Sequence, residues 1–497
     1  MSDRFRPATL LPHPTVVQIA VRLLILMGCL ALAFWRTVLH VISESQNGSM
    51  VSYIFPTMML TLVAGQGIAR RRADMLPIHD RQADNIAAAM ALLLAFAIMS
   101  LLVPRYRDHY QLLHLDSSAE LIFAAGAAVL MFGLRPVSQF WPVWLFVLGF
   151  NPFLYRMMTI SLGGTAYSAG VVMVIAAGVA TAIAVGRTWV RAAVGAAITL
   201  AVGAAVLQLI SNLAPDVPWF VLQTVPSLAA SSSVSAAFFF HRRVGKPLRL
   251  LDSDTIKPLT AKTVRDSALG LALASAVFAV LPLPTSNSLP IEPAPPTLSA
   301  SRPLTLPPGW LTTRLTDAGD IRTLFGPDAT LIRQRIVAAH GDHRWDLQAR
   351  PRIVSIDIIS APPSTRNTFD VYPEGSLYSA VGTRRSPAIT VDLGHHISAR
   401  LYTVVDENLL LTYTKLIFAW ANHNTTQRVT LVTVDDHRPA GPFPQPGFSL
   451  SNYLIDTFSI MIRGNAISVD KAPTYKDRDF LAQLGHQLID AQYGTAS

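Results

Sequence analysis

Long apolar runs dominate the first 283 residues of the chain. Nine of these runs have about 17 to 26 residues, close to the roughly 20 that a helix needs to cross the hydrocarbon of a bilayer. They are Thr15–Trp35, Met50–Ile68, Ile86–Val103, Ser118–Leu134, Val137–Leu154, Ile160–Val185, Ala192–Ile210, Val217–Phe240 and Ser267–Leu283. The pattern predicts a polytopic α-helical membrane domain of about nine spans over residues 1–283. Pro142 and Pro152 indicate a kinked or re-entrant fifth segment, because proline interrupts the backbone ladder.

The pattern changes after the last apolar run. Residues 284–308 are rich in proline, which favours an extended, semi-rigid spacer that lifts the following domain off the membrane. From residue 309 to 497, charge and polarity return to soluble values. Short β-branched segments there predict strands, and two segments with helical apolar spacing predict helices. The strands are Arg352–Ile359, Ala388–Leu393, Ile397–Val405 and Arg428–Val434, and the helices are Ser449–Met461 and Lys476–Ala491. We expect an α+β domain built on an antiparallel sheet.

Composition agrees with a membrane protein, since 51% of the chain is apolar and only 14% is charged. The net charge of +9 suggests a nucleic-acid partner at first. Most of the cations, however, lie in short loops between apolar runs, where they indicate topology and make the bilayer the expected partner. Sixteen Lys and Arg residues fall in segments on one predicted side of the membrane, and only Arg36, Arg105, Arg107 and Arg156 fall on the other side. This bias predicts a cytoplasmic N-terminus and, after nine crossings, an extracytoplasmic C-terminal domain.

The single cysteine, Cys29, lies within the first apolar run. One cysteine excludes an intramolecular disulfide and a cysteine-based zinc site. No cofactor or metal site is expected elsewhere. His395 and His396 are adjacent, so on a strand they would point to opposite faces. Asp435, Asp436 and His437 precede a Pro and Gly turn, which favours a solvated turn over a metal or acid–base cluster.

The candidate functional residues lie in the predicted outer loops, where a covering domain could enclose a cavity that water reaches. Outer loops otherwise avoid arginine in this chain, so each outer arginine is an exception to the charge bias. The candidates are Arg105, Arg107, Asp108, His109, His114 and Arg156.

Several landmarks in residues 48–152 resemble the exosortase and archaeosortase family of cell-surface sorting transpeptidases. Gly48 leads into a second span that ends in an Arg-rich triplet, and a glycine-leucine-basic turn is followed by a helix bounded by prolines. The residues are Gly48, Arg70, Arg71, Arg72, Gly133, Leu134, Arg135, Trp141, Pro142, Phe146, Asn151 and Pro152. The resemblance implies a multi-pass protein of the bacterial plasma (inner) membrane that handles an extracytoplasmic protein or surface polymer.

The chain departs from this family at its nucleophile. The family is expected to use an outward-facing cysteine with arginine and histidine. Cys29 lies in a different helix and is followed by Leu30 and Ala31 instead of Ser-Gly. The chain is therefore either a divergent relative without cysteine transpeptidase chemistry, or the resemblance is only architectural.

Two other functions stay open from the sequence. A polyprenyl-phosphate-dependent membrane glycosyltransferase also combines many helices with an outer C-terminal domain. That class needs an acidic residue in the first outer loop, where this chain offers Glu44, with His40 one helical turn away. The other alternative is a non-catalytic membrane scaffold with an outer interaction domain, which predicts no convergent polar cavity at the outer leaflet.

Overall fold

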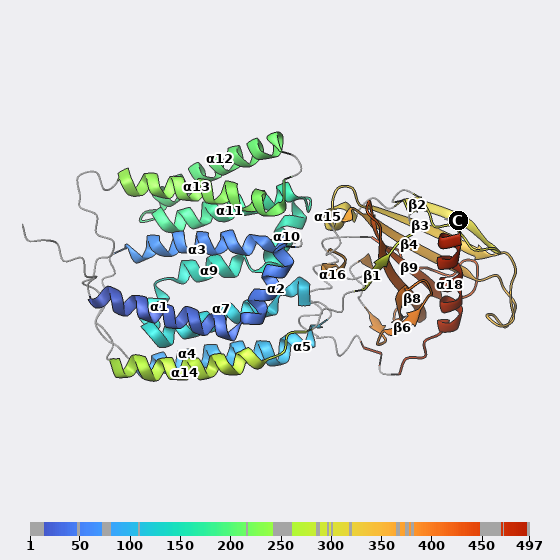
Figure 1. Cartoon of the computed structure of the whole chain (residues 1–497), viewed down its shortest axis with the longest axis horizontal. Coiled ribbons are helices and arrows are strands. Elements are labelled where there is room, and N and C mark those ends of the chain that lie inside the picture. The colour runs from blue at the N-terminus through green and yellow to red at the C-terminus, as the bar shows by residue number, and fades with distance from the viewer. Residues whose placement is uncertain are drawn as a thin grey trace, which may run out of the picture.

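A computed structural model shows a helical bundle joined end to end with a sheet domain (Figure 1). The structure describes residues 14–46, 50–71, 81–107, 110–214, 217–241, 261–284, 289–295, 298–299, 302–317, 321–363, 368–372, 377–378, 382–447, 469–470 and 472–494. The predicted helix Ser449–Met461 lies outside these residues.

The bundle contains helices that run roughly parallel to one long axis (Figure 1). Its helices are α1 (Pro14–Ala33), α2 (Trp35–Gln46), α3 (Ile54–Ala69), α4 (Arg81–Ala97), α5 (Val103–Arg105), α6 (Tyr110–Leu113), α7 (Leu115–Phe132), α8 (Leu134–Ser138), α9 (Trp141–Gly149), α10 (Pro152–Ser161), α11 (Ala166–Val185), α12 (Trp189–Leu213), α13 (Trp219–His241) and α14 (Ala261–Val280). A short 3₁₀ turn, η1 (Met50–Tyr53), precedes α3, and a π-helical turn, η2 (Ile98–Leu102), follows α4.

Among the described residues, five helices are long and apolar enough to cross a membrane, or up to seven if each of two bent helix pairs is one span. The five are Met50–Ala69, Arg81–Arg105, Leu115–Phe132, Ala166–Val185 and Trp189–Leu213. Helices α13 and α14 lie alongside them in the same bundle (Figure 1). The predicted helix-rich class, with several helices apolar enough to cross a membrane, is therefore confirmed.

Both bent pairs lie near the end of the bundle that faces the sheet domain. The first pair bends by 75° between α1 and α2, so part of the predicted first outer loop is helical. The second bends by 57° between α9 and α10, where the predicted kink lies. Asn151 ends the first half of that pair and caps the second, because its side chain accepts a hydrogen bond from the backbone N–H of Phe153.

Helix α11 lies at the centre of one half of the bundle, packed against α3, α12 and α13. Its small residues allow this contact: a side chain at Gly170 would meet Leu207 at 2.6 Å. The same holds on the facing helix, where a side chain at Gly203 would meet Val174 at 2.8 Å. Small residues are what close helix packing in lipid requires.

The C-terminal domain is built on one mainly antiparallel sheet. Its strands are β1 (Ile291–Pro293), β2 (Trp310–Asp317), β3 (Thr330–Ala338), β4 (Ile353–Ala361), β5 (Thr383–Arg385), β6 (Ile389–Asp392), β7 (Ser398–Asp406), β8 (Leu411–Ala421) and β9 (Thr426–Val434). The order is β2-β3-β4-β9-β8-β7-β5, with β6 on β7 and β1 parallel to β8. Helix α18 (Arg478–Gly494) covers one face, where Leu484 and Leu488 pack on the main core.

The sequence predicted four of these strands and helix α18 within a few residues. It missed β1, β2, β3, β5 and β8. In β8, residues Tyr413 to Trp420 are all buried, and a strand covered on both faces lacks the alternation that marks a half-buried strand. His395 and His396 lie between the two predicted strands, in the turn between β6 and β7, with φ of 49° and 64°. His395 stacks on Tyr493 with ring centroids 4.3 Å apart.

The segment predicted as a semi-rigid spacer, residues 284–308, is partly packed into the sheet domain. Strand β1 pairs with β8, and Leu304 is 4% exposed in the main core. The side chain of Gln427 donates to the backbone carbonyl of Ser299. Proline has no backbone N–H group, so a proline-rich segment forms few hydrogen bonds by itself. Here the edge of β8 and the side chain of Gln427 provide its hydrogen-bond partners.

The bundle and the sheet domain share one apolar cluster. It joins Phe153, Met157 and Ile160 of α10 to Leu324 and Phe325 of α15 (Arg322–Phe325) in the sheet domain. Short helix α16 (Thr368–Val371) packs in the same place (Figure 1). The domain therefore covers the ends of α6 and α10.

Candidate functional site

A group of titratable side chains, the outer-end cluster, lies where α2, α6, α7 and α10 meet beneath the sheet domain. It consists of His40, Glu44, Tyr110, His114, Asp116 and Arg156. The 75° bend after α1 turns α2 away from the line of α1, and the spacing of four residues places His40 and Glu44 on one face of α2. His114 joins α6 to α7 in a left-handed conformation, with φ 41° and ψ 52°.

Glu44 links the two histidines of the outer-end cluster. One carboxylate oxygen lies 3.5 Å from Nδ1 of His40, and the other lies 3.5 Å from Nε2 of His114. On its other side, Nδ1 of His114 lies 3.8 Å from Oδ1 of Asp116. The Tyr110 hydroxyl donates to Oδ2 of Asp116 at 2.7 Å. A chain of acids and bases therefore runs from His40 to Tyr110.

The centre of the cluster is closed to solvent. His114, Asp116 and Arg156 are 0%, 1% and 2% exposed. Within the described part of the chain, neither ring nitrogen of His114 has a hydrogen-bond partner. Two unpaired polar atoms in a buried site are costly, so they require a functional explanation.

Burial determines the charge of His114. The carboxylates of Glu44 and Asp116 favour the imidazolium, but complete burial, together with the positive charges of Arg156 and His40, holds the pKa of His114 well below its usual value. Full desolvation outweighs two contacts that are longer than hydrogen bonds. His114 is therefore neutral at pH 7, with one nitrogen that can accept a proton and one that can donate.

Arg156 brings a positive charge to the seam between the bundle and the sheet domain. Its Nη1 donates to the backbone carbonyl of Gln111 at 2.6 Å. It also acts on Tyr372 of the sheet domain, where burial raises the pKa to about 12 although Arg156 opposes the shift. A buried guanidinium is a strong ligand for a carboxylate or a phosphate.

The structure brings together two of the six candidates from the sequence, His114 and Arg156. Arg105 and Arg107 are exposed on the segment that leads to α6, and Asp108 and His109 lie outside the described residues. From the sequence, Glu44 and His40 were candidates only under the glycosyltransferase alternative. Tyr110 and Asp116 were not among the candidates. The four-residue spacing of His40 and Glu44 is typical of one face of a helix, but a loop was predicted at these positions.

Other polar groups that the sequence singled out serve the fold. Arg22 in α1 is 4% exposed. His437 was expected in a solvated turn, but its Nδ1 lies 2.7 Å from Oδ2 of the buried Asp346. Asp346 also binds Arg350, whose hydrogen bonds hold the pKa of Asp346 below its usual range. This network fixes the loop between β3 and β4.

Among the described residues, no group of three or more His, Cys, Asp or Glu side chains has a geometry that could hold a metal ion. Comparison with protein-family models, with curated proteins and with solved structures gave no match. The outer-end cluster is thus the main basis for a function. It can transfer protons through His114 and Glu44 and hold an anion at Arg156.

Proposed function

We propose that the chain is an exosortase-like integral membrane protein of the bacterial plasma membrane, which handles an extracytoplasmic protein or surface polymer without cysteine transpeptidase chemistry. The observation that carries the proposal is the outer-end cluster, buried where the sheet domain covers the helix ends. Two histidines, two carboxylates, a tyrosine and an arginine converge there from four helices. A scaffold without chemistry has no need for such a group.

The proposed topology has nine spans, with the N-terminus inside and the sheet domain outside. Counting each bent pair once gives up to seven candidate spans, and α13 and α14 run beside them at similar length. Basic residues gather at the opposite end of the bundle from the sheet domain. There Arg187 donates to the carbonyl of Arg70, and Arg81 donates to that of Leu130. This charge bias supports a cytoplasmic location for that end of the bundle.

Reporter fusions test the topology. A reporter at the C-terminus should be active only outside the cytoplasm, and one inserted at residue 254 should be active only inside. A cytoplasmic C-terminal reporter would overturn the nine-span arrangement and place the outer-end cluster on the wrong side for this function.

The chemistry that fits the site is general acid–base catalysis. Neutral His114 accepts a proton from a substrate nucleophile, and Glu44, 3.5 Å from its Nε2, orients the ring and stabilises the imidazolium that forms. Arg156 holds an anionic group of the substrate. Cys29 packs among apolar side chains of α1 and its neighbours and takes no part.

Substitutions in the cluster test this role. Surface proteins and surface polymers are compared between cells that carry the wild-type chain, no chain, Glu44→Gln, His114→Asn or Arg156→Gln. The three variants should resemble the null cells while membrane insertion and expression stay normal. Cys29→Ser is the matched control and should resemble the wild type. Normal surface material in all three cluster variants would refute the proposal.

One observation favours the polyprenyl-phosphate-dependent glycosyltransferase as a second candidate. Glu44, which was expected in the first outer loop, has a side chain only 15% exposed and contacts two histidines. An acidic base at the outer end of the first span is what that class requires. The two candidates differ in what a Glu44→Gln strain accumulates: lipid-linked sugar for the glycosyltransferase, and unprocessed protein or polymer for the exosortase-like function.

A further inference from the structure

The outer-end cluster is sealed on the side of the sheet domain. The apolar cluster that α10 shares with α15 and α16 closes over α6, and His114 beneath it is fully buried. A side chain at Gly164, between α10 and α11, would overlap the backbone carbonyl of Thr323, so the contact is tight. The residues that the sheet domain places at this seam are therefore neighbours of the cluster.

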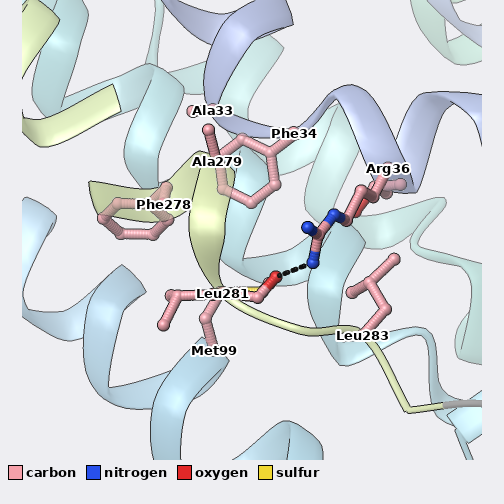
Figure 2. A pocket seen from close by; sticks show the side chains of 9 residues that line it. Ala33, Phe34, Arg36, Met99, Phe278, Ala279, Leu281 and Leu283 are labelled. Atoms are coloured by element: carbon pink, nitrogen blue, oxygen red, sulfur yellow. Dashed lines mark hydrogen bonds between the residues drawn. The ribbon is translucent and has the colours of Figure 1, made fainter. Parts of the chain in front are cut away.

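The outer-end cluster is also closed toward α1 and α14. A small pocket lies there at the bend between α1 and α2, and its cation Arg36 donates from Nη1 to the carbonyl of Leu281 (Figure 2). Thr37 lines the pocket and is 2% exposed, and its hydroxyl is hydrogen-bonded to the carboxylate of Asp116. Because Thr37 separates the pocket from Asp116, the pocket is not part of the cluster.

Tyr372 of the sheet domain lies at the seam, directly after α16. Helix α16 packs against α6, where the carbonyl of Gln111 accepts a hydrogen bond from Nη1 of Arg156. Tyr372 also belongs to the same apolar cluster as Met157, the residue that follows Arg156 in α10. The positive charge of Arg156 acts on Tyr372 as it does on His114. The Tyr372 side chain is therefore within the electrostatic range of the arginine of the outer-end cluster.

The sheet domain holds Tyr372 through both its backbone and its ring. Nη1 of Arg428 donates to the backbone carbonyl of Tyr372 at 2.7 Å. The Tyr372 ring meets Phe325 edge to face, with ring centroids 5.8 Å apart, and Tyr372 is 1% exposed. A ring fixed in this way keeps its hydroxyl in one place, as a group that binds a ligand requires.

The Tyr372 hydroxyl has no hydrogen-bond partner among the described residues. In the same part of the chain, the side-chain oxygen of Gln111 and both ring nitrogens of His114 also lack one. A buried tyrosine hydroxyl usually finds a partner, because leaving it alone costs free energy. Around Arg156 there is thus a donor at Tyr372 and an acceptor at Gln111, which a polar ligand could satisfy.

We infer that the sheet domain completes the outer-end cluster with Tyr372, whose hydroxyl donates to the same carboxylate or phosphate group of the substrate as Arg156. The inference rests on the proposed function and adds a residue of the second domain to its site. An anion can accept from a guanidinium and a hydroxyl at once, and both hydrogen bonds are charge-assisted. The anion supplies the acceptor that the hydroxyl lacks, and it is held by both groups only while the sheet domain covers the helix ends.

Tyr372→Phe tests the inference, because it removes the hydroxyl and keeps the ring. Since that hydroxyl has no partner among the described residues, the midpoint of thermal unfolding of the purified full-length protein should be no lower than that of the wild type. Surface proteins and polymers of Tyr372→Phe cells should nevertheless resemble those of Arg156→Gln cells. A lowered midpoint, or normal surface material, would overturn the inference.

Tyr378→Phe is the matched control in the same domain. The Tyr378 hydroxyl donates to Oδ2 of the buried Asp357, so its removal should lower the unfolding midpoint. Surface material in Tyr378→Phe cells should follow the amount of folded protein and stay above the level of the null cells. If the Tyr372 variant also lost function only in proportion to folded protein, Tyr372 would have a structural role alone, and the inference would be refuted.

Small anions test the site without its substrate. The unfolding midpoint of the purified full-length protein is measured against inorganic phosphate and, separately, acetate, with chloride keeping the ionic strength constant. One of them should raise the midpoint of the wild type, and this identifies phosphate or carboxylate as the group recognised. Tyr372→Phe should need about tenfold more anion for the same rise, the effect of one lost charge-assisted hydrogen bond, and Arg156→Gln should show no rise. No rise in the wild type, or an unchanged response in Tyr372→Phe, would contradict the inference.

The inference and the proposed function fail separately. If Arg156→Gln cells lack their surface material while Tyr372→Phe cells are normal, the inference is refuted and the proposed function stands. If Glu44→Gln, His114→Asn, Arg156→Gln and Tyr372→Phe cells are all normal, the proposed function fails and the inference fails with it.

Discussion

Replacing Gly164 by alanine should loosen the sheet domain from the bundle. Gly164 has a φ of +69°, and a side chain there would overlap the carbonyl oxygen of Thr323 and come within 3.0 Å of its Cα. The left-handed conformation costs alanine about 1 kcal/mol. The clash costs more, because both partners are backbone and no rotamer change relieves it. To restore an ordinary contact, the backbones of residues 164 and 323 must move apart by more than about 1 Å. A gap of that size removes a quarter to a half of the dispersion energy of the nearest contacts.

Overpacking of this kind costs about 1–3 kcal/mol in a rigid core, in addition to the backbone strain. Gly163→Ala is the matched control, since Gly163 has a φ of +107° but nothing lies within 4 Å of the position that an alanine methyl group would take. Its φ lies further from the left-handed region that alanine tolerates, so this variant carries at least as much backbone strain, but without the clash. The difference between the two variants therefore isolates the contact between the bundle and the sheet domain.

Hydrogen exchange followed by mass spectrometry is the assay. In Gly164→Ala, amides of α10 and of residues 321–325 should exchange faster, while those of β8 and β9 in the middle of the sheet should keep their wild-type rates. Gly163→Ala should leave the interface close to wild type. Equal acceleration in both variants would show that strain in the turn, and not contact with Thr323, controls the interface, and the sealed site would lose its support.

Three further changes test other parts of the structure. Arg333 binds Asp357 through two hydrogen bonds at 2.6 and 2.8 Å, so Arg333→Met leaves the Asp357 carboxylate buried without its cation. Thermal unfolding should show a loss of about 3–5 kcal/mol of stability, and adding Asp357→Leu to the same chain should largely restore it. A single variant as stable as the double variant would contradict this. His114 has a lowered pKa when folded, so its contribution to stability is complete above its unfolded pKa of about 6.5 and is lost as the pH falls below that value. The wild type should therefore lose thermal stability between about pH 7 and pH 5 at up to about 1.4 kcal/mol per pH unit, His114→Asn should lose less, and identical profiles would refute the assignment. Cys29→Ser should leave function in cells intact, whereas loss of function would restore thiol catalysis.

Part of this molecule follows from the sequence alone. Apolar runs near 20 residues predicted a helical bundle, and the return of polarity predicted a separate domain with an antiparallel sheet, because burial of apolar groups depends on local composition and periodicity. The kink at Pro152 was also predictable, since proline acts on its own backbone. Each of these features is determined by residues close together in the chain.

The outer-end cluster depended on contacts that no local pattern contains. Glu44 was expected in a loop, and the 75° bend between α1 and α2 brings it to His114, seventy positions along the chain. Likewise, the proline-rich segment was predicted as a semi-rigid spacer, and only the tertiary structure pairs its strand β1 with β8. Helices and strands form where neighbouring residues favour them, but the pairing of distant side chains depends on how whole elements pack, and here the tertiary structure alone buried Glu44, His114 and Arg156 together.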